Sequence, residues 1–336
     1  MAKVTLIQMV YNAMKYIPKS FDSMVNQTFK DVEIVAVING SEDGGKEYIQ
    51  QHYPQVKIID PGENLKFVRG HNLVFPQITS EFVQLVNQDL FLETDYVEKV
   101  LKEFENPTVG GVNGKVYQYD WLTNTKTNVL DTTGIVCSRN GRGKSRGQNE
   151  EDHGQYDNQM EIVGVDGAAC MYRRSALEAV KYTRSDGTIE YFDVDFEMYW
   201  EDVDLSLRLQ NAGFTCRFVP GAVGYHGRTA ASSKKGYKDV GEFREHHKKF
   251  PAWIKQFNYK NHIFLVVKNF PKFYWKFFVR EFFMLGYIVL LETATLRIVP
   301  TLFKQLPTMW KKRKWIAQHR KSMEWAKLLN NKGLLS

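Results

Sequence analysis

The stretch VEIVAVINGSEDGG, residues 32–45, decides the fold class. It opens with a near-continuous apolar run at 32–38, which is typical of a strand in a parallel sheet that helices cover on both faces. Similar runs occur at residues 4–10, 56–59 and 82–86. Two helical stripes lie between and after these runs: Ile17, Phe21, Met24 and Val25, and then Val97, Val100, Leu101 and Phe104. Strands that alternate with helices predict an α/β protein with a doubly wound, mostly parallel sheet.

Polar residues follow three of these strands. Tyr11 and Asn12 come directly after the first strand, residues 39–43 after the second and residues 87–89 after the fourth. In sheets of this class, ligands bind beyond the carboxyl ends of the strands. We therefore expect a binding site where these three segments meet.

The region from 117 to 160 is polar and rich in glycine, without apolar periodicity. It contains SRNGRGKSRGQ (138–148), which has basic residues and no acidic one. We expect a long loop that is a lid closing on phosphates, a solvated connection or a nucleic-acid patch. Beyond it, the pattern predicts strands at 161–165, 168–172 and 214–219 and helices at 174–180 and 202–212.

The net charge of +7 is unevenly distributed along the chain. Residues 251–336 carry 16 Lys and Arg against 3 Asp and Glu, a net charge of +13, which leaves −6 for residues 1–250. Phenylalanine, tyrosine and tryptophan crowd into the same region between 250 and 283, and KKRK follows at 311–314. Helices of this composition dock on anionic membrane surfaces, although they also bind nucleic acid or pack as ordinary helices. We favour the membrane surface and expect no nucleic-acid partner.

The composition, with 43% apolar and 25% charged residues, is that of a globular protein. No signal peptide is recognisable at the start, and the apolar run at 282–291 is shorter than the roughly 20 residues of a membrane-spanning helix. Cys137, Cys170 and Cys216 lack the spacing of a metal site or a redox pair. They indicate reduced thiols and a cytosolic compartment.

Three segments carry residues suited to catalysis or metal binding. Asp89 follows a buried strand, where its carboxylate either binds a divalent cation or caps a turn. Glu201, Asp202 and Asp204 begin a predicted helix, where acids also stabilise the helix dipole and Asp204 has the spacing of an ordinary ion pair with Arg208. His226 follows a strand and turn, as either a structural residue or a ligand. Each segment alone leaves both alternatives open.

Together, and in this order, these segments resemble the family 2 glycosyltransferases with the GT-A fold, most closely the bacterial rhamnosyltransferase-like branch. The resemblance covers essentially the whole chain. It rests on YN (11–12), SMVNQTF (23–29), INGSEDGG (38–45), ENLKFVRGHN (63–72), LVNQDLFLETDYVEKV (85–100), VDGAACMYRRSALEAV (165–180), FEMYWEDVDLSLRLQNAGF (196–214) and VPGAVGYHG (219–227). It implies a Rossmann-like GT-A domain over residues 1–245. A helical region over residues 246–336 follows it, and this region is basic, rich in aromatic residues and expected to associate with a membrane.

The resemblance also implies roles for individual residues. It assigns the binding of a divalent metal, Mg²⁺ or Mn²⁺, to Asp89 and His226, and catalysis to Asp202 with Glu201 beside it. The residues that it places at the nucleotide, the donor sugar or the acceptor are Tyr11, Asn12, Asn39, Ser41, Asp43, Asn64, Arg69, Asn72, Asn87, Asp166, Gly167, Ala168 and Arg208.

The sequence departs from the family pattern at three positions. Ile38 stands where an Asp usually precedes the Asn-Gly-Ser stretch, and Lys66 stands where Gly is usual. Asn87 occupies the first position of the metal motif, a variant at home in this branch. With Ile38 the chain lacks a carboxylate that could bind a pyrimidine N–H, so this departure affects recognition of the nucleobase. It does not affect the expected metal ligands or the expected catalytic base.

The activity that the resemblance implies is an inverting transfer of L-rhamnose from dTDP-L-rhamnose to a lipid-linked saccharide in cell-surface polysaccharide biosynthesis. The alternatives are another donor, a UDP-hexose or UDP-galactofuranose, or a non-catalytic protein that binds sugar nucleotides. An NAD-dependent oxidoreductase is disfavoured because no Gly-x-Gly-x-x-Gly follows the first strand. We expect a peripheral protein on the cytoplasmic face of the cell membrane, with a homo-oligomer left open.

Overall fold

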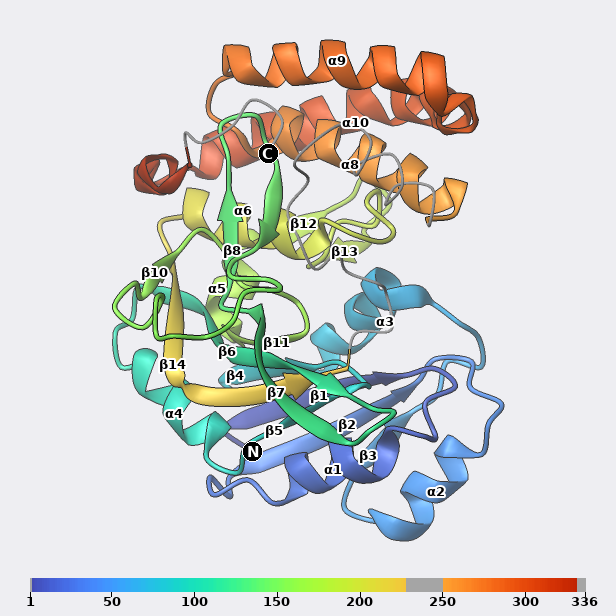
Figure 1. The fold of residues 1–336 in the computed structure, drawn as a ribbon, viewed down its shortest axis with the longest axis vertical. Helices are drawn as coiled ribbons and strands as arrows, with labels where there is room; N and C mark the ends of the chain where they lie inside the picture. Colours follow the sequence, from blue (N-terminus) through green and yellow to red (C-terminus); the bar gives the residue numbers. More distant parts are fainter. Residues whose placement is uncertain (1, 228–249, 331–336) are drawn as a thin grey trace.

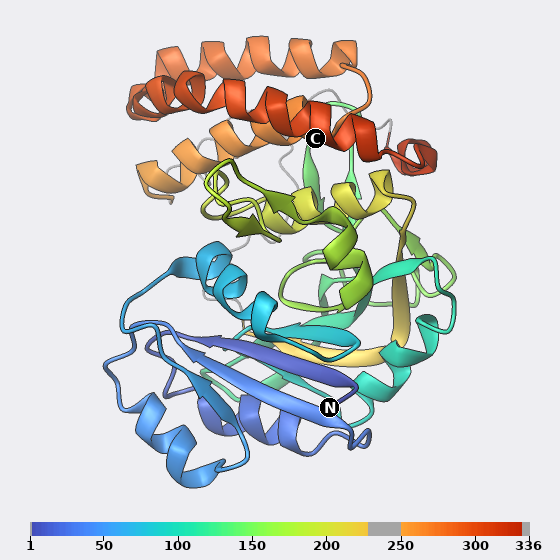
Figure 2. The same cartoon turned by 180° about the vertical axis from the view of Figure 1, so that it is seen from behind.

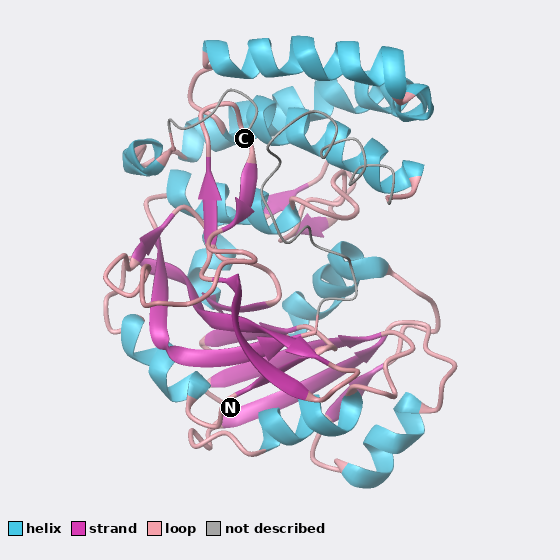
Figure 3. Ribbon diagram, in the orientation of Figure 1, coloured by secondary structure: helices cyan, strands magenta, loops and turns pink. Residues whose placement is uncertain are grey.

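The computed structural model describes residues 2–227 and 250–330, an α/β body with a helical layer at one end (Figure 1). Within these residues a curled ten-stranded sheet has the order β10–β14–β6–β11–β4–β1–β2–β3, with β5 beside β14 and β7 beside β6 (Figure 3). Its strands are β1 (Val4–Val10), β2 (Val32–Ile38), β3 (Lys57–Ile59), β4 (Phe82–Val86), β5 (Leu90–Leu92), β6 (Val109–Asp120), β7 (Thr125–Thr132), β10 (Glu161–Ile162), β11 (Ala169–Arg173) and β14 (Thr215–His226).

The first half of the sheet is parallel, as the apolar runs predict. β1 pairs in parallel with β2 and β4, and β2 pairs in parallel with β3. The second half is mixed, because β11 is antiparallel to both β4 and β6, whereas β14 is parallel to β6. β1, β2 and β4 have the predicted bounds, and the α/β class is confirmed, with antiparallel pairs joining the parallel ones in the second half of the sheet.

Helices cover both faces of the sheet and bury a separate core on each. On one face, α1 (Ile17–Val25), α2 (Gly45–His52) and α4 (Tyr96–Glu103) contribute apolar side chains such as Phe21 and Val100. On the other, α3 (Lys66–Val74), α5 (Arg174–Val180) and α6 (Glu201–Asn211) contribute side chains such as Leu177 and Leu205. Short segments complete this part of the chain: η1 (Phe75–Gln77), β12 (Tyr182–Thr183) and β13 (Ile189–Glu190).

The region from 117 to 160 is not the predicted long loop. β6 extends to Asp120, β7 returns along it, and β8 (Ile135–Cys137) and β9 (Gly143–Ser145) form a second hairpin. The alternation of β7 is weak because most of its first five residues, TKTNV, are polar and open to solvent. Arg146 in the expected basic loop is buried instead, and its guanidinium donates to Thr133 and to the Gln159 carbonyl.

The C-terminal helices are α8 (Ala252–Asn269), α9 (Trp275–Leu291) and α10 (Val299–His319), with the short segments η2 (Thr293–Ile298) and η3 (Glu324–Leu328). α8 lies against the α/β body and α9 lies on the outside (Figures 1 and 2). Phe264 of α8 and Phe270, the residue after its end, share a third core with Val203 and Leu207 of α6. The predicted domain boundary at 245/246 falls outside the described residues.

Part of the positive charge of this region is internal. Lys260, Lys268 and Lys312 are 0%, 2% and 1% exposed. Lys268 and Lys312 contact carboxylates of the α/β body, and Lys260 donates to the Asp195 carbonyl. These three lysines therefore hold the helices to the body and do not belong to a surface.

None of the described helices is long and apolar enough to cross a bilayer alone. By length and composition, α9 could cross a bilayer only together with the segment Thr293–His319, and the chain bends by 115° between the two.

Candidate active site

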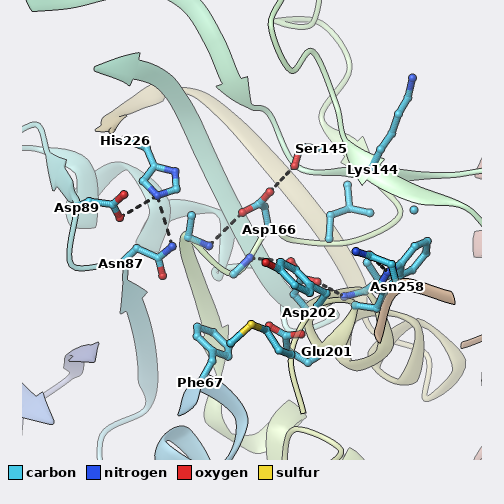
Figure 4. Close-up of a pocket in the computed structure, with 18 residues that line it drawn as sticks. Phe67, Asn87, Asp89, Lys144, Ser145, Asp166, Glu201, Asp202, His226 and Asn258 are labelled. Carbon is cyan, nitrogen blue, oxygen red and sulfur yellow. Dashed lines mark hydrogen bonds and ion pairs between the residues drawn. The ribbon is translucent and has the colours of Figure 1, made fainter. Parts of the chain in front are cut away.

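One pocket of about 480 Å³ lies at the carboxyl ends of the central strands (Figure 4). Its lining combines segments far apart in the chain, which meet only after folding. They are Phe67 of α3, Asn87 and Asp89 after β4, Ile135, Gly143, Lys144 and Ser145 of the β8–β9 hairpin, Asp166 to Ala168 before β11, Met198 to Val203 at the start of α6, His226 of β14 and Asn258 of α8.

Asp89 and His226 form a buried pair at one end of the pocket. The Nε2 atom of His226 lies 3.1 Å from Asp89 Oδ1 and 3.5 Å from the Asn87 amide nitrogen. On the other side of the ring, Nδ1 lies 2.8 Å from Asp131 Oδ2. Burial lowers the pKa of His226, but Asp131 and Asp89 raise it more, to about 10. Burial raises and His226 lowers the pKa of Asp89, and the net shift is downward.

This donor set fits a divalent cation. An imidazole nitrogen and a carboxylate oxygen face each other, and the far nitrogen of the ring is held by a second carboxylate, as in carboxylate–histidine–metal arrangements. A cation between Asp89 and His226 would take the place of the imidazole proton. Among the described residues, no three His, Cys, Asp or Glu side chains form a complete metal site. Mg²⁺ at such a site typically takes its remaining ligands from substrate phosphates and water.

Glu201 and Asp202 lie in the first turn of α6, separate from that pair. Asp202 Oδ2 accepts a hydrogen bond from the Gly167 N–H at 3.1 Å, which joins α6 to the segment before β11. Burial, with the Asp166 carboxylate second, raises the pKa of Asp202 to about 6. Burial and then Asp202 raise the pKa of Glu201 to about 8. At neutral pH Asp202 is therefore the group that is ready to accept a proton.

A second cluster of predicted residues forms the edge beyond β1 and β2. Asn39 and Asn64 are joined by a 3.1 Å hydrogen bond, and Ser41 Oγ donates to the Val10 carbonyl at 2.9 Å. The Asn12 N–H donates to Ser41 Oγ and the Met14 N–H to Asp43 Oδ2. The Tyr11 N–H donates to Gln88 Oε1, which connects this edge to the loop that carries Asp89. The structure therefore brings these residues together beside the pocket, not in its lining.

A family model described as Glycosyl transferase family 2 matches residues 5–181. The chain belongs to this family. It is 30% identical over 122 residues to "Glycosyltransferase GlyA" of Streptococcus pneumoniae, a match that spans 35% of this chain and only 17% of that protein. It is 22% identical over 264 residues to "N-acetylglucosaminyl-diphospho-decaprenol L-rhamnosyltransferase" of Mycobacterium tuberculosis, with 72% of this chain and 81% of that protein covered.

Solved glycosyltransferase structures confirm the GT-A fold. The crystal structure of GalNAc-T7 with UDP, GalNAc and Mn²⁺ superposes with a TM-score of 0.65 at 10% identity, and the match covers 97% of this chain and 56% of that chain. At this identity the likeness supports the fold alone. The family 2 membership and the GT-A architecture that the motifs imply are thus both confirmed.

Three further predicted residues lie away from the pocket lining. Arg69 is exposed on α3. The Asn72 side chain accepts hydrogen bonds from the Tyr191 and Phe192 N–H groups and donates one to the Phe192 carbonyl. Arg208 is buried in an ion pair with Asp204 at 2.9 Å and donates to the Val180 and Tyr191 carbonyls. Of the two alternatives, the structure therefore has the ordinary i,i+4 ion pair. The positions of Asn72 and Arg208 do not support the expected contact with a nucleotide.

Other residues in and behind the pocket are not predicted from the sequence. Lys144 lies in the basic stretch, and Ser145 donates to Asp166 Oδ2 at 2.6 Å. Asn258 comes from the C-terminal helices, and it accepts the Trp200 indole N–H at 2.8 Å. Asp131 stands behind His226 on β7. The basic run is a signal for Lys144, but no local pattern marks Asn258 or Asp131.

Proposed function

We propose that this chain is an inverting glycosyltransferase that moves a sugar from a nucleoside diphosphate to an acceptor hydroxyl with the help of a divalent cation. One observation carries the proposal. The same pocket holds a buried carboxylate–imidazole pair, Asp89 and His226, and a separate half-buried carboxylate, Asp202, whose pKa is raised. A sugar transfer needs both functions at different places, charge neutralisation at the leaving group and a base at the nucleophile.

Asp202 is the residue that would accept the proton. As the acceptor oxygen forms its bond to the anomeric carbon, its proton passes to the Asp202 carboxylate, and the bond to the diphosphate breaks with its electron pair on the leaving group. General-base assistance of this kind contributes about 10²- to 10⁴-fold. A single displacement from the face opposite the leaving group inverts the anomeric carbon, by the same geometry as in inverting glycosidases.

Asp89 and His226 are the residues that would hold Mg²⁺ or Mn²⁺. When bound, the cation stabilises the negative charge that develops on the diphosphate. Asp131 would keep the His226 ring oriented, since its carboxylate lies 2.8 Å from Nδ1. Ser145 and the Ala168 N–H both donate to Asp166, which keeps that carboxylate at the edge of the pocket, where it can meet sugar hydroxyls.

dTDP-L-rhamnose is the donor that we propose, and a UDP-hexose or UDP-galactofuranose is its rival. The support is the name of the mycobacterial relative, which describes an L-rhamnosyltransferase acting on a decaprenyl-diphosphate sugar. That name also supports a lipid-linked saccharide as the acceptor, and hence a place in the biosynthesis of a cell-surface polysaccharide.

A lipid acceptor agrees with the exposed apolar face of α9, and we propose that this face docks peripherally on the cytoplasmic membrane surface. Eight large apolar side chains of α9 are at least 45% exposed: Trp275, Phe278, Phe282, Phe283, Leu285, Val289, Leu290 and Leu291. Phe303 and Trp310 of α10 add to them. Lys272, Lys304 and Lys311 are exposed nearby in the chain, while Glu324 is the one exposed carboxylate within 250–330. Such a face suits an anionic interface.

The proposed reaction is tested with a panel of nucleotide sugars and Mn²⁺. The true donor is expected to raise the melting temperature, since a ligand at 100 times its Kd stabilises a protein by about 2.7 kcal/mol. The same donor should then release its nucleoside diphosphate when a lipid-linked saccharide is added. Stabilisation by dTDP-L-rhamnose without turnover on any acceptor would favour a binding protein instead, and stabilisation by a UDP-sugar alone would replace the donor.

A further inference from the structure

The turn that leads into the helix of Asp202 has an unfavourable backbone conformation. Glu197, Tyr199 and Trp200 have φ angles of 60°, 68° and 72°, in the left-handed region that non-glycine residues avoid. Trp200 directly precedes α6, so this turn sets where α6 begins. A conformation of this kind persists only where its surroundings hold it in place.

One side chain of α8 makes several of the hydrogen bonds that stabilise this turn. The Asn261 amide nitrogen donates to three carbonyls of the turn, those of Phe196, Met198 and Tyr199, at 2.8, 2.9 and 2.9 Å. Asn261 is 0% exposed, so its amide makes these bonds away from water. Because a buried carbonyl without a partner is costly, removing the amide favours another conformation of the turn.

Neighbouring residues of α8 continue the contact along α6. Asn258, one turn before Asn261, accepts the indole N–H of Trp200. Lys268 and Asn269, two turns after it, bind the Asp204 carboxylate in the first turn of α6. Side chains along one face of α8 thus bind both the turn and the helix that carries Asp202. Asn261 itself is absent from the pocket lining.

We propose that Asn261 is a positioning residue, which holds the turn 196–200 so that Asp202 meets the Gly167 N–H and faces the acceptor hydroxyl. The proposal rests on the proposed function of Asp202 and adds a role for the C-terminal helices in catalysis. Misplacement of a catalytic group by about 1 Å can cost 10²-fold in rate. Asp89, His226 and the loops after β1 and β2 belong to other elements, so we expect donor binding to be spared.

The test compares kinetics and stability of Asn261→Ala in the full chain. We expect kcat to fall about 10- to 100-fold, with the donor KM and the Mn²⁺ affinity unchanged within about threefold. Met309→Ala is the control, because Met309 is fully buried in α10 and belongs to the same third core. It should lower the melting temperature at least as much and leave kcat near that of the wild type. Asn261→Ser, with a smaller loss expected, replaces the alanine variant if that variant does not fold.

A second substitution tests the backbone argument directly. Glycine adopts a positive φ without steric cost, so Glu197→Gly should restore part of the kcat lost in Asn261→Ala and change little in the wild-type background. A wild-type kcat in the Asn261 variants, or equal loss of kcat in Met309→Ala, would overturn the proposal. If the wild-type chain transfers no sugar at all, the proposed function fails instead.

Discussion

The Lys268 ammonium lies 2.8 Å from the carboxylate of Asp204, two residues after the proposed base Asp202. The same ammonium lies 2.6 Å from Asp193, and both partners are almost completely buried. Ion pairs taken out of water are stabilising only with further hydrogen bonds, which Asn269 and Arg208 supply to Asp204. The C-terminal helices are therefore joined to α6, the helix of the proposed base, by buried charges.

Lys312 makes the matching connection from α10, and its loss should destabilise the protein. Its ammonium contacts Glu190 at 2.8 Å, Asp193 at 2.5 Å and Asp195 at 2.9 Å, and the residue is 1% exposed. Lys312→Met leaves these carboxylates short of one cation, which typically costs about 3 to 5 kcal/mol. Urea or thermal unfolding measures the loss.

The neighbouring residue gives a matched control for this measurement. Lys311 is exposed, so Lys311→Met should change the free energy of unfolding by no more than about 0.5 kcal/mol. Equal stabilities for the two variants would show that the buried cluster does not hold α10 to the body.

Asp202 and Glu201 should respond differently to neutralisation. Asp202→Asn removes the proposed base and should lower kcat by about 10²- to 10⁴-fold with the donor KM unchanged. Glu201→Gln should keep most of the activity at pH 7, because the pKa of Glu201 is raised to about 8 and the wild-type side chain is already protonated there. Steady-state kinetics of both variants decide; an inactive Glu201→Gln beside an active Asp202→Asn would exchange their roles.

The same base predicts the acid limb of the pH profile. A base works only when deprotonated, and burial with Asp166 raises the pKa of Asp202 to about 6. Activity should therefore rise with pH and reach half its plateau near pH 6, well above the usual range of an aspartate. An acid limb near pH 4 would mean that Asp202 is solvated in the working enzyme, or that another group is the base.

Asp131 should strengthen metal binding without being a metal ligand itself. Its carboxylate contacts His226 Nδ1 from the buried side, so Asp131→Asn is expected to weaken Mn²⁺ affinity by about 10- to 100-fold. Asp89→Ala, which removes a proposed ligand, should weaken it further, and EDTA should abolish transfer. Calorimetric titration of Mn²⁺ with the nucleoside diphosphate present measures the affinities. Asp60→Asn, at an exposed ion pair with Lys46, is the control. Full transfer in EDTA would reject metal dependence.

Sequence patterns predict the parts of this protein whose signal is local. β1, β2 and β4 are continuous apolar runs, so their bounds follow from the sequence, and the motif residues Asp89, Asp202 and His226 do line one pocket. The β6–β7 hairpin is missed because its exposed polar residues hide the alternation of a strand. Asn258 and Asn261 are missed for a different reason. They reach the turn before Asp202 from about 60 residues away, through a helix whose own pattern indicates only aromatic and basic faces.

The exposed face of α9 yields the last prediction, because the C-terminal helices both pack on the body and leave apolar side chains uncovered. Phe282 and Leu290 are 75% and 79% exposed. Replacing both by Glu should abolish sedimentation with anionic liposomes at low salt and leave the melting temperature within a few degrees, since neither side chain is buried. Binding of the wild type should weaken as salt rises, because the Debye length falls from about 10 Å at 0.1 M to about 3 Å at 1 M. Leu122→Glu is the matched control, because Leu122 is 89% exposed on the turn between β6 and β7 and should bind liposomes like the wild type. A wild-type chain that stays in the supernatant at low salt would show that α9 faces something other than a membrane.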